Sequence, residues 1–327
     1  MTLSLLPIDA ASYQQDPLHR SDRVWTETNC YVDVWIELLH ALGLDPLACA
    51  AFPISTDFEV GQWTFFKFPP EDLRAAYGID VFEMNAWRPI IEHVAEELAR
   101  GRLLTVEVDS WFLPDTRGVS YQIAHVKSTI VAQMLDVDAR RLGYFHNAGY
   151  FELSGDDFDG VFRLGQHANP EGLPPYVEII RLDRLRRKDP EQQLRSTVEL
   201  LRTHLSRLPT TNPMYRFHSR LESDIDWLRS HGIEGFHAYA FGTCRQCGAS
   251  AELAASFVEW LAAREPSGPG DLPKAAAAYR SIADRCKALE FGLARLARGR
   301  NIDLDGIFSQ LATDWDDATT ILTARYA

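Results

Sequence analysis

The hydrophobic positions near the start of the chain predict an amphipathic helix. Residues 31–42 (YVDVWIELLHAL) place their large apolar side chains on one stripe with helical spacing, and Gly43 follows as a stop signal. Two shorter helices are predicted at 70–77, opened by two prolines and closed by Gly78, and at 87–100, closed by Gly101. A further short helix is expected at 156–162.

Between and after these helices the pattern changes to strands rich in β-branched residues. The predicted strands span 103–109, 125–137, 141–147 and 176–182. The turn at Asp138-Ala139-Arg140 joins two of them into an antiparallel hairpin, with His125 at its open end. The pattern of helices and strands in the first half of the chain therefore predicts an α+β domain.

Beyond residue 185 the helical period dominates. Helices are predicted at about 190–207, 213–231, 246–264, 272–298 and 303–325, separated by proline and glycine. With 327 residues, two domains are the natural expectation. We place an α+β domain at 1–185 and an all-helical domain at 186–327.

Composition and charge narrow the possible partners and the compartment. Acidic residues outnumber basic ones by 46 to 33, and the net charge of −13 disfavours broad contact with nucleic acid or an anionic membrane. The five cysteines show no disulfide-framework spacing, so reduced thiols are expected. The start of the chain lacks the pattern of a secretory signal, and no stretch has the length of a membrane helix. These features together predict a cytoplasmic protein.

Cys30 lies at the predicted start of the first helix. Unpaired backbone N–H groups at such a position stabilise a thiolate over a thiol, which favours a nucleophile. Thr28 and Asn29 just before it are short polar residues that could cap the helix or donate to a developing oxyanion. The alternative is a buried cysteine that only packs.

The later residues complete a known order of catalytic groups. His125 opens one strand of the hairpin and Asn147 ends the other, which gives the papain-type order of cysteine, histidine and asparagine. In that arrangement the histidine is the base and the amide orients its ring. The alternative is a histidine with a structural role at the end of a strand.

Several segments resemble known families. The run DSWFLPD (109–115), followed by a strand-opening histidine, resembles the amino-terminal domain of the butirosin-biosynthesis acyltransferase family over about residues 25–160. Over most of the chain, segments such as ETNCYVDVWIELLHALGLDPLA and YFHNAGYFELSGDDFDGVFRL resemble the bacterial domain-of-unknown-function 1839 family, which implies no activity.

The acyltransferase resemblance implies a papain-like fold and a specific reaction. An acyl or aminoacyl group would move from a carrier-protein thioester, presented on phosphopantetheine, to an amine, with no other cofactor and no metal. Cys30 would be the nucleophile, His125 the base and Asn147 the third member. Asp109 would shape the site from its own strand or, alternatively, bond the loop at Leu113-Pro114.

Other interpretations remain open from the sequence. The same residues would serve a cysteine amidase or peptidase, and a catalytically silent binding or scaffold protein would keep the fold without the reaction. Cys244 and Cys247 form a CxxC that indicates either a metal or redox site or helical core positions. The basic run at 181–189 indicates either a docking surface for an acidic carrier protein or a solvated segment.

Overall fold

The computed structural model describes residues 1–169 and 171–327 and divides them into two compact units. The first unit comprises 1–21, 29–46 and 70–187, and the second comprises 22–28, 47–69 and 188–327. Two early stretches, which the sequence assigned to the α+β domain, thus group with the helices.

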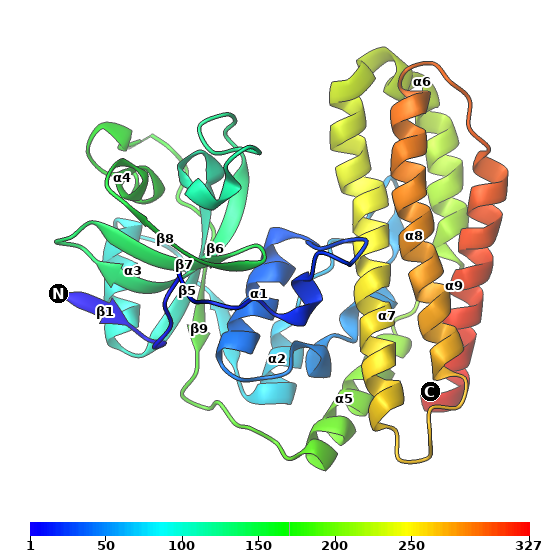
Figure 1. Ribbon diagram of the computed structural model, residues 1–327, viewed down its shortest axis with the longest axis horizontal. Coiled ribbons are helices and arrows are strands. Elements are labelled where there is room, and N and C mark those ends of the chain that lie inside the picture. The colour runs from blue at the N-terminus through cyan, green and yellow to red at the C-terminus, as the bar shows by residue number, and fades with distance from the viewer. Residues whose placement is uncertain (170) are drawn as a thin grey trace. The chain divides into compact units, whose positions relative to one another are not determined.

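Unit 1 is built on a seven-stranded sheet, and Figure 1 shows its strands twisted together. The strands are β1 (Thr2–Ser4), β4 (Asp80–Glu83), β5 (Arg102–Asp109), β6 (Lys127–Asp136), β7 (Arg141–His146), β8 (Gly149–Ser154) and β9 (Val177–Arg181). Their order is β4-β9-β5-β6-β7-β8, β1 also pairs with β6, and every pairing is antiparallel. The predicted hairpin is confirmed as β6 and β7, and the sequence pattern missed the short strands β1, β4 and β8.

Four helices accompany this sheet. They are α1 (Cys30–Ala41), α2 (Pro70–Tyr77), α3 (Ile90–Ala99) and α4 (Asp156–Phe162), each close to its predicted range. Helix α1 packs against β6, β7 and β8, whereas α3 packs against β5, β6 and β1. Gly43 follows α1 with φ of 67°, a left-handed conformation in which glycine has no Cβ penalty.

The polar side of helix α1 is buried, as is its apolar stripe. Asp33 and Glu37 are both almost completely buried, and the imidazole of His19 lies between them. The Nε2 atom of His19 lies 3.2 Å from Asp33 Oδ1, and its Nδ1 atom bonds Glu37. Tyr13 donates a further hydrogen bond of 2.6 Å to Glu37. Residues from the first 21 positions thus neutralise carboxylates that the helix buries.

This buried cluster predicts that unit 1 loses stability in mild alkali. Burial alone lowers the pKa of His19, but its bonds to Asp33 and Glu37 outweigh burial and raise the pKa to about 9. A histidine whose pKa is raised on folding stabilises the fold fully below its unfolded value of 6.5 and ceases to do so above about 9. The shift corresponds to about 3 kcal/mol of unfolding free energy, lost between these limits.

Denaturant unfolding measured from pH 6 to pH 10 checks this expectation. The His19→Gln variant lacks the titrating group and should show a flatter pH dependence over that range. Equal pH dependences in the wild type and the variant would contradict a charged His19.

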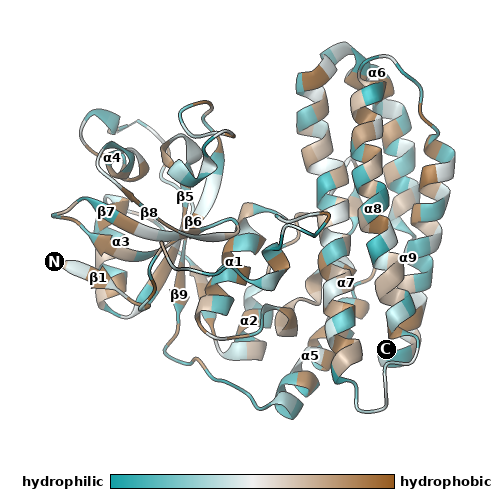
Figure 2. Cartoon of the chain, in the orientation of Figure 1, coloured by the Kyte–Doolittle hydropathy of each residue, from teal (hydrophilic) through white to brown (hydrophobic). Residues whose placement is uncertain are grey.

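Unit 2 is predominantly helical. Its helices are α5 (Pro190–Leu205), α6 (Pro213–Ala240), α7 (Gln246–Arg264), α8 (Leu272–Leu296) and α9 (Leu304–Tyr326), with a π-helical turn at Phe241–Arg245 between α6 and α7. Figure 1 shows α6, α7, α8 and α9 side by side as a bundle, and hydrophobic and hydrophilic positions alternate along α8 in Figure 2. A small two-stranded sheet, β2 (Phe58–Glu59) with β3 (Gln62–Trp63), also belongs to this unit.

The helical predictions hold except at the end of α6. The predicted helix stopped before Gly232, and the structure continues through a kink at that residue, where φ is 58° and ψ is −141°. Glycine adopts this conformation without strain, so the chain bends and then resumes a helix. No helix among the described residues is long and apolar enough to cross a membrane. The predicted α+β class with a helical C-terminal region is confirmed.

Candidate functional site

Cys30 is the first residue of α1 and is partly exposed. Asn29 caps the helix, because its side chain accepts a hydrogen bond of 3.0 Å from the backbone N–H of Val32. The Cys30 thiol donates to the Thr129 hydroxyl across 3.7 Å. The sulfur therefore lies against β6, at the end of the helix where backbone N–H groups favour negative charge.

His125 lies just before β6 and forms a pair with Asp109. The Nδ1 atom of His125 lies 2.6 Å from Asp109 Oδ2, and the ring stacks on Trp111 with 4.5 Å between ring centres. The other carboxylate oxygen of Asp109 accepts from the backbone N–H of Trp111 at 3.0 Å and caps the turn Ser110–Phe112. Asp109 thus bonds both its own loop and the histidine.

This geometry leaves the Nε2 atom of His125 open for proton transfer. Among the described residues, no hydrogen-bond partner is recorded for it, and 68% of the side chain is exposed. A carboxylate on Nδ1 fixes the tautomer that carries its proton there, so Nε2 is the basic nitrogen. The Asp109–His125 pair therefore has the hydrogen-bonding arrangement that a general base requires.

Strand register relates Thr129, which contacts Cys30, to Asp109, which bonds His125. Thr129 lies opposite Glu107, and Lys127 lies opposite Asp109. Alternate residues of a strand and directly paired residues share a face, so Thr129 and Asp109 point to the same side. A strand rises about 3.3 Å per residue, so the pair that contains Asp109 lies about 7 Å along β6 from Thr129, the residue that contacts Cys30. The structure does not join the thiol and the imidazole by a hydrogen bond.

A cavity lies beside the Asp109–His125 pair. Its volume is about 330 Å³, and its lining includes Glu107, Asp109, His125, Lys127, Arg163 and Tyr176. Cys30 is not among its lining residues, but Thr129, which it contacts, pairs with the lining residue Glu107. Lys127 donates a hydrogen bond of 2.9 Å to Glu107, which keeps this part of the wall polar.

The remaining residues predicted for the site lie elsewhere. Asn147 occupies the turn between β7 and β8 with φ of 44°, and the residue that bonds His125 is Asp109. The predicted contact of Asn147 with the His125 ring is thus replaced in the structure by the hydrogen bond from Asp109. Thr28 is buried in unit 2, where its carbonyl accepts from Arg245 at 3.2 Å.

A second histidine, His146 at the end of β7, was missed by the sequence analysis. The Nε2 atom of His146 lies 2.6 Å from the Ser128 hydroxyl, and its Nδ1 atom bonds Asp115. The hydrogen bonds link a serine to a histidine and the histidine to an aspartate, as in a hydrolase triad. However, only 1% of the His146 side chain and 7% of Ser128 are exposed. This network is therefore internal structure, and the DSWFLPD segment supplies the carboxylate for both histidines.

The other four cysteines are enclosed in unit 2. Burial, together with the neighbouring Cys286, raises the pKa of Cys244, and the Cys247 thiol together with burial raises the pKa of Cys286. Cys49 and Cys247 are buried as well. These four residues are buried core thiols, which agrees with the packing interpretation of the CxxC.

Because of this contrast, we expect one fast-reacting thiol in the native protein. Cys30 alone among the five described cysteines is accessible, so iodoacetamide at neutral pH should modify it first and reach the others only after denaturation. Intact mass spectrometry over time counts the modified thiols. The Cys30→Ala variant should show no fast phase. A wild-type protein that resists alkylation would contradict an accessible Cys30 and favour a binding or scaffold role.

Comparison with protein families accounts for nearly the whole chain. The model described as the DUF1839 N-terminal domain matches residues 14–182, and the DUF1839 C-terminal domain model matches residues 190–324. A search of curated proteins finds no match. The first model spans Cys30, Asp109 and His125, and the second spans the bundle. The chain therefore belongs to the DUF1839 family.

Proposed function

We propose that this protein is a cysteine-dependent acyltransferase with a papain-like N-terminal domain. Cys30 would be the nucleophile, and the Asp109–His125 pair would be the general base. The observation that carries the proposal is a partly exposed thiol at a helix start in contact with β6, together with a histidine that bonds Asp109 and lines a cavity. The substrates would be an acyl or aminoacyl carrier-protein thioester and an amine.

The first chemical step takes place at the sulfur. The Cys30 thiolate attacks the thioester carbonyl carbon, the carbon–sulfur bond to the carrier breaks, and the carrier leaves as a thiolate. Exchange between two sulfurs is nearly balanced in energy, so the leaving group needs little protonation. The backbone N–H groups at the start of α1 stabilise the negative charge that develops there.

The second step takes place between the acyl-enzyme and the amine. The amine nitrogen attacks the carbonyl carbon, His125 Nε2 takes a proton from that nitrogen, and the bond to Cys30 breaks to return the thiolate. This role requires the bound amine nitrogen to lie within hydrogen-bond distance of His125 Nε2 while it attacks the acyl carbon on Cys30.

A transfer assay tests the proposal. The full-length protein is incubated with an N-acetylcysteamine thioester of glycine, as a carrier mimic, and glycinamide, and the products are separated by mass spectrometry. An amide that increases with amine concentration supports acyl transfer. Loss of the acyl group to water at every amine concentration would indicate a hydrolase, and an unconsumed thioester would indicate a silent protein. Either of these outcomes would overturn the proposal.

A further inference from the structure

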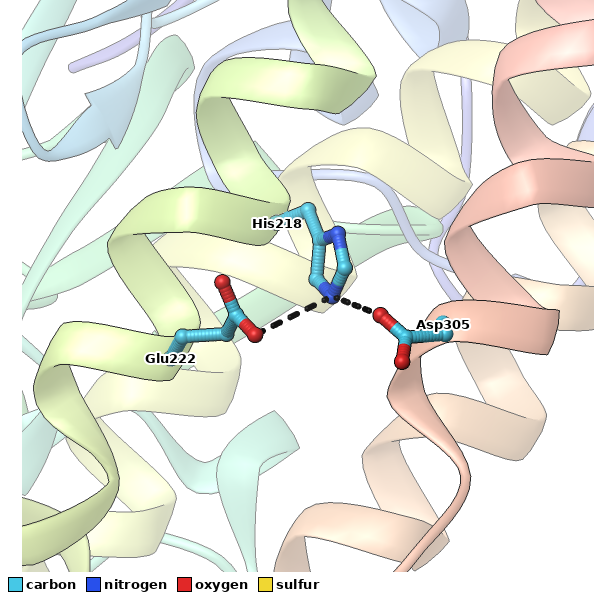
Figure 3. A group of neighbouring side chains, drawn as sticks. All are labelled: His218, Glu222 and Asp305. Carbon is cyan, nitrogen blue, oxygen red and sulfur yellow. Dashed lines mark ion pairs between the residues drawn. The ribbon is translucent and has the colours of Figure 1, made fainter.

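A cluster of three ionisable side chains in the helical bundle is unrelated to the site in unit 1. His218 and Glu222 lie one turn apart on α6, and Asp305 lies in the first turn of α9. Figure 3 shows the three side chains converging from the two helices. From the geometry we infer that they form a binding site for a divalent transition-metal cation such as Zn²⁺.

The distances within the cluster suit ligands around one ion better than direct bonds. The Nε2 atom of His218 lies 3.4 Å from Asp305 Oδ1 and 3.9 Å from Glu222 Oε1, and the three ligand atoms lie within 4.8 Å of one another. Zinc binds nitrogen and oxygen at about 2.0–2.2 Å, so two ligands at the tetrahedral angle are separated by about 3.4 Å. These separations leave room for an ion at the centre.

His218 is oriented for such a role. Its Nε2 atom is shielded from solvent, and no hydrogen-bond partner is recorded for it among the described residues. The ring stacks on the buried Phe308 with 4.6 Å between ring centres and 14° between planes, which fixes the direction of Nε2. The ion pairs of this nitrogen with Asp305 and Glu222 are longer than a normal hydrogen bond, and a metal ion would give it a shorter bond.

The ligand set also selects the class of cation. One imidazole nitrogen with two carboxylates favours zinc and its transition-metal neighbours, whereas Mg²⁺ and Ca²⁺ prefer oxygen ligands alone. The carboxylates of Glu222 and Asp305 are 57% and 91% exposed, so water would complete the coordination. Their two negative charges offset the positive end of α9, which by itself repels a cation. Bound metal would connect α6 to the beginning of α9.

Zinc titration of the full-length protein tests this site. The parent is the Cys30→Ala variant, treated with chelator and kept reduced, so that the accessible thiol does not compete for metal. Calorimetry should show one Zn²⁺ bound, and the melting temperature should rise by about 2–4 °C at saturating Zn²⁺. Mg²⁺ at the same concentration should leave the melting temperature unchanged.

Variants of the exposed ligands distinguish this site from other zinc binding. The Glu222→Gln/Asp305→Asn double variant should bind Zn²⁺ at least about tenfold more weakly and lose the thermal shift. Asp226→Asn is the matched control, because Asp226 is a 98% exposed carboxylate on the same helix outside the cluster. Equal Zn²⁺ binding in the parent and the double variant, or no binding by the parent, would overturn the inference.

Discussion

Replacing His125 with alanine is expected to slow acyl transfer to the amine by about 10²–10⁴-fold, the usual contribution of a general base. Formation of the Cys30 acyl-enzyme should be affected much less, because the structure places no hydrogen bond between the thiol and this imidazole. The acyl-enzyme should therefore accumulate in the variant. Rapid-quench measurements of acyl-enzyme and amide against time separate the two steps.

Another histidine–aspartate pair of unit 1, largely exposed at its aspartate, provides the matched control. His167 Nε2 lies 2.9 Å from Asp156, outside the cavity that His125 lines. His167→Ala should transfer at the wild-type rate, whereas Asp109→Asn should resemble His125→Ala in direction because the ring loses its orienting carboxylate. Equal slowing of both steps in His125→Ala would contradict a base that serves the acceptor alone.

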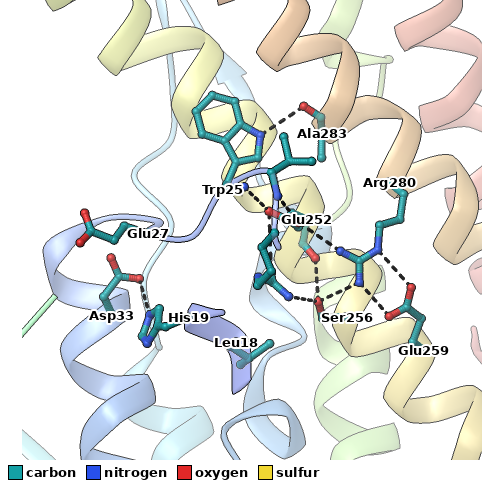
Figure 4. Close-up of polar contacts among 12 residues, drawn as sticks. Leu18, His19, Trp25, Glu27, Asp33, Glu252, Ser256, Glu259, Arg280 and Ala283 are labelled. Carbon is teal, nitrogen blue, oxygen red and sulfur yellow. Dashed lines mark hydrogen bonds and ion pairs between the residues drawn. The ribbon is translucent and has the colours of Figure 1, made fainter. Parts of the chain in front are cut away.

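Glu252→Ala is expected to lower the free energy of unfolding of unit 2 by about 3–5 kcal/mol, the cost of breaking a buried charged network. Only 2% of the Glu252 side chain is exposed. Its oxygens accept from the backbone N–H groups of Val24 (3.1 Å) and Trp25 (2.6 Å) and from Arg280 (3.2 Å), as Figure 4 shows. Removal of the carboxylate leaves these donors without their acceptor.

The matched control for Glu252 lies two turns further along α7. Glu259 forms an ion pair of 2.8 Å with the same Arg280, but 51% of its side chain is exposed. Glu259→Ala should change the unfolding free energy by about 1 kcal/mol or less. Urea denaturation measures both variants, and hydrogen exchange of residues 22–28 should accelerate only in Glu252→Ala. Equal effects of the two substitutions would show that burial of Glu252 does not matter.

The sequence predicts local structure well where one segment carries its own signal. The apolar stripe of 31–42, the β-branched runs and the proline and glycine boundaries locate most of the helices and long strands. The helix containing Cys30 and the hairpin beginning near His125 follow from such signals. The strand β8 was missed because its residues, GYFELS, lack a run of β-branched side chains.

Contacts between distant segments were not predictable in the same way. The pairing of Asp109 with Lys127 brings Asp109 to His125, but the loop 110–126 separates the strands and neither strand fixes the register alone. The sequence pattern of α1 predicts that its polar side is exposed to solvent. No residue near Asp33 and Glu37 in the sequence indicates that His19 will cover them. The anchoring of residues 24 and 25 by Glu252 likewise joins segments more than two hundred positions apart.

The DSWFLPD segment shows what a local motif reveals and what it leaves out. The sequence directed attention to Asp109 at its beginning, and the structure adds that Asp115 at its end bonds His146. The segment thus holds one histidine at a cavity and another inside the domain. Only burial distinguishes the two, since 68% of the His125 side chain is exposed against 1% of His146.

Trapping the covalent intermediate tests most directly whether the thiol of residue 30 carries an acyl group. His125→Ala protein is mixed with the glycyl thioester without amine, quenched in acid, and analysed by intact mass and peptide mapping. We predict one added glycyl group per chain, on the peptide containing Cys30, and none when Cys30 is also replaced by alanine. An unmodified chain, or an adduct that persists without Cys30, would contradict the proposed function.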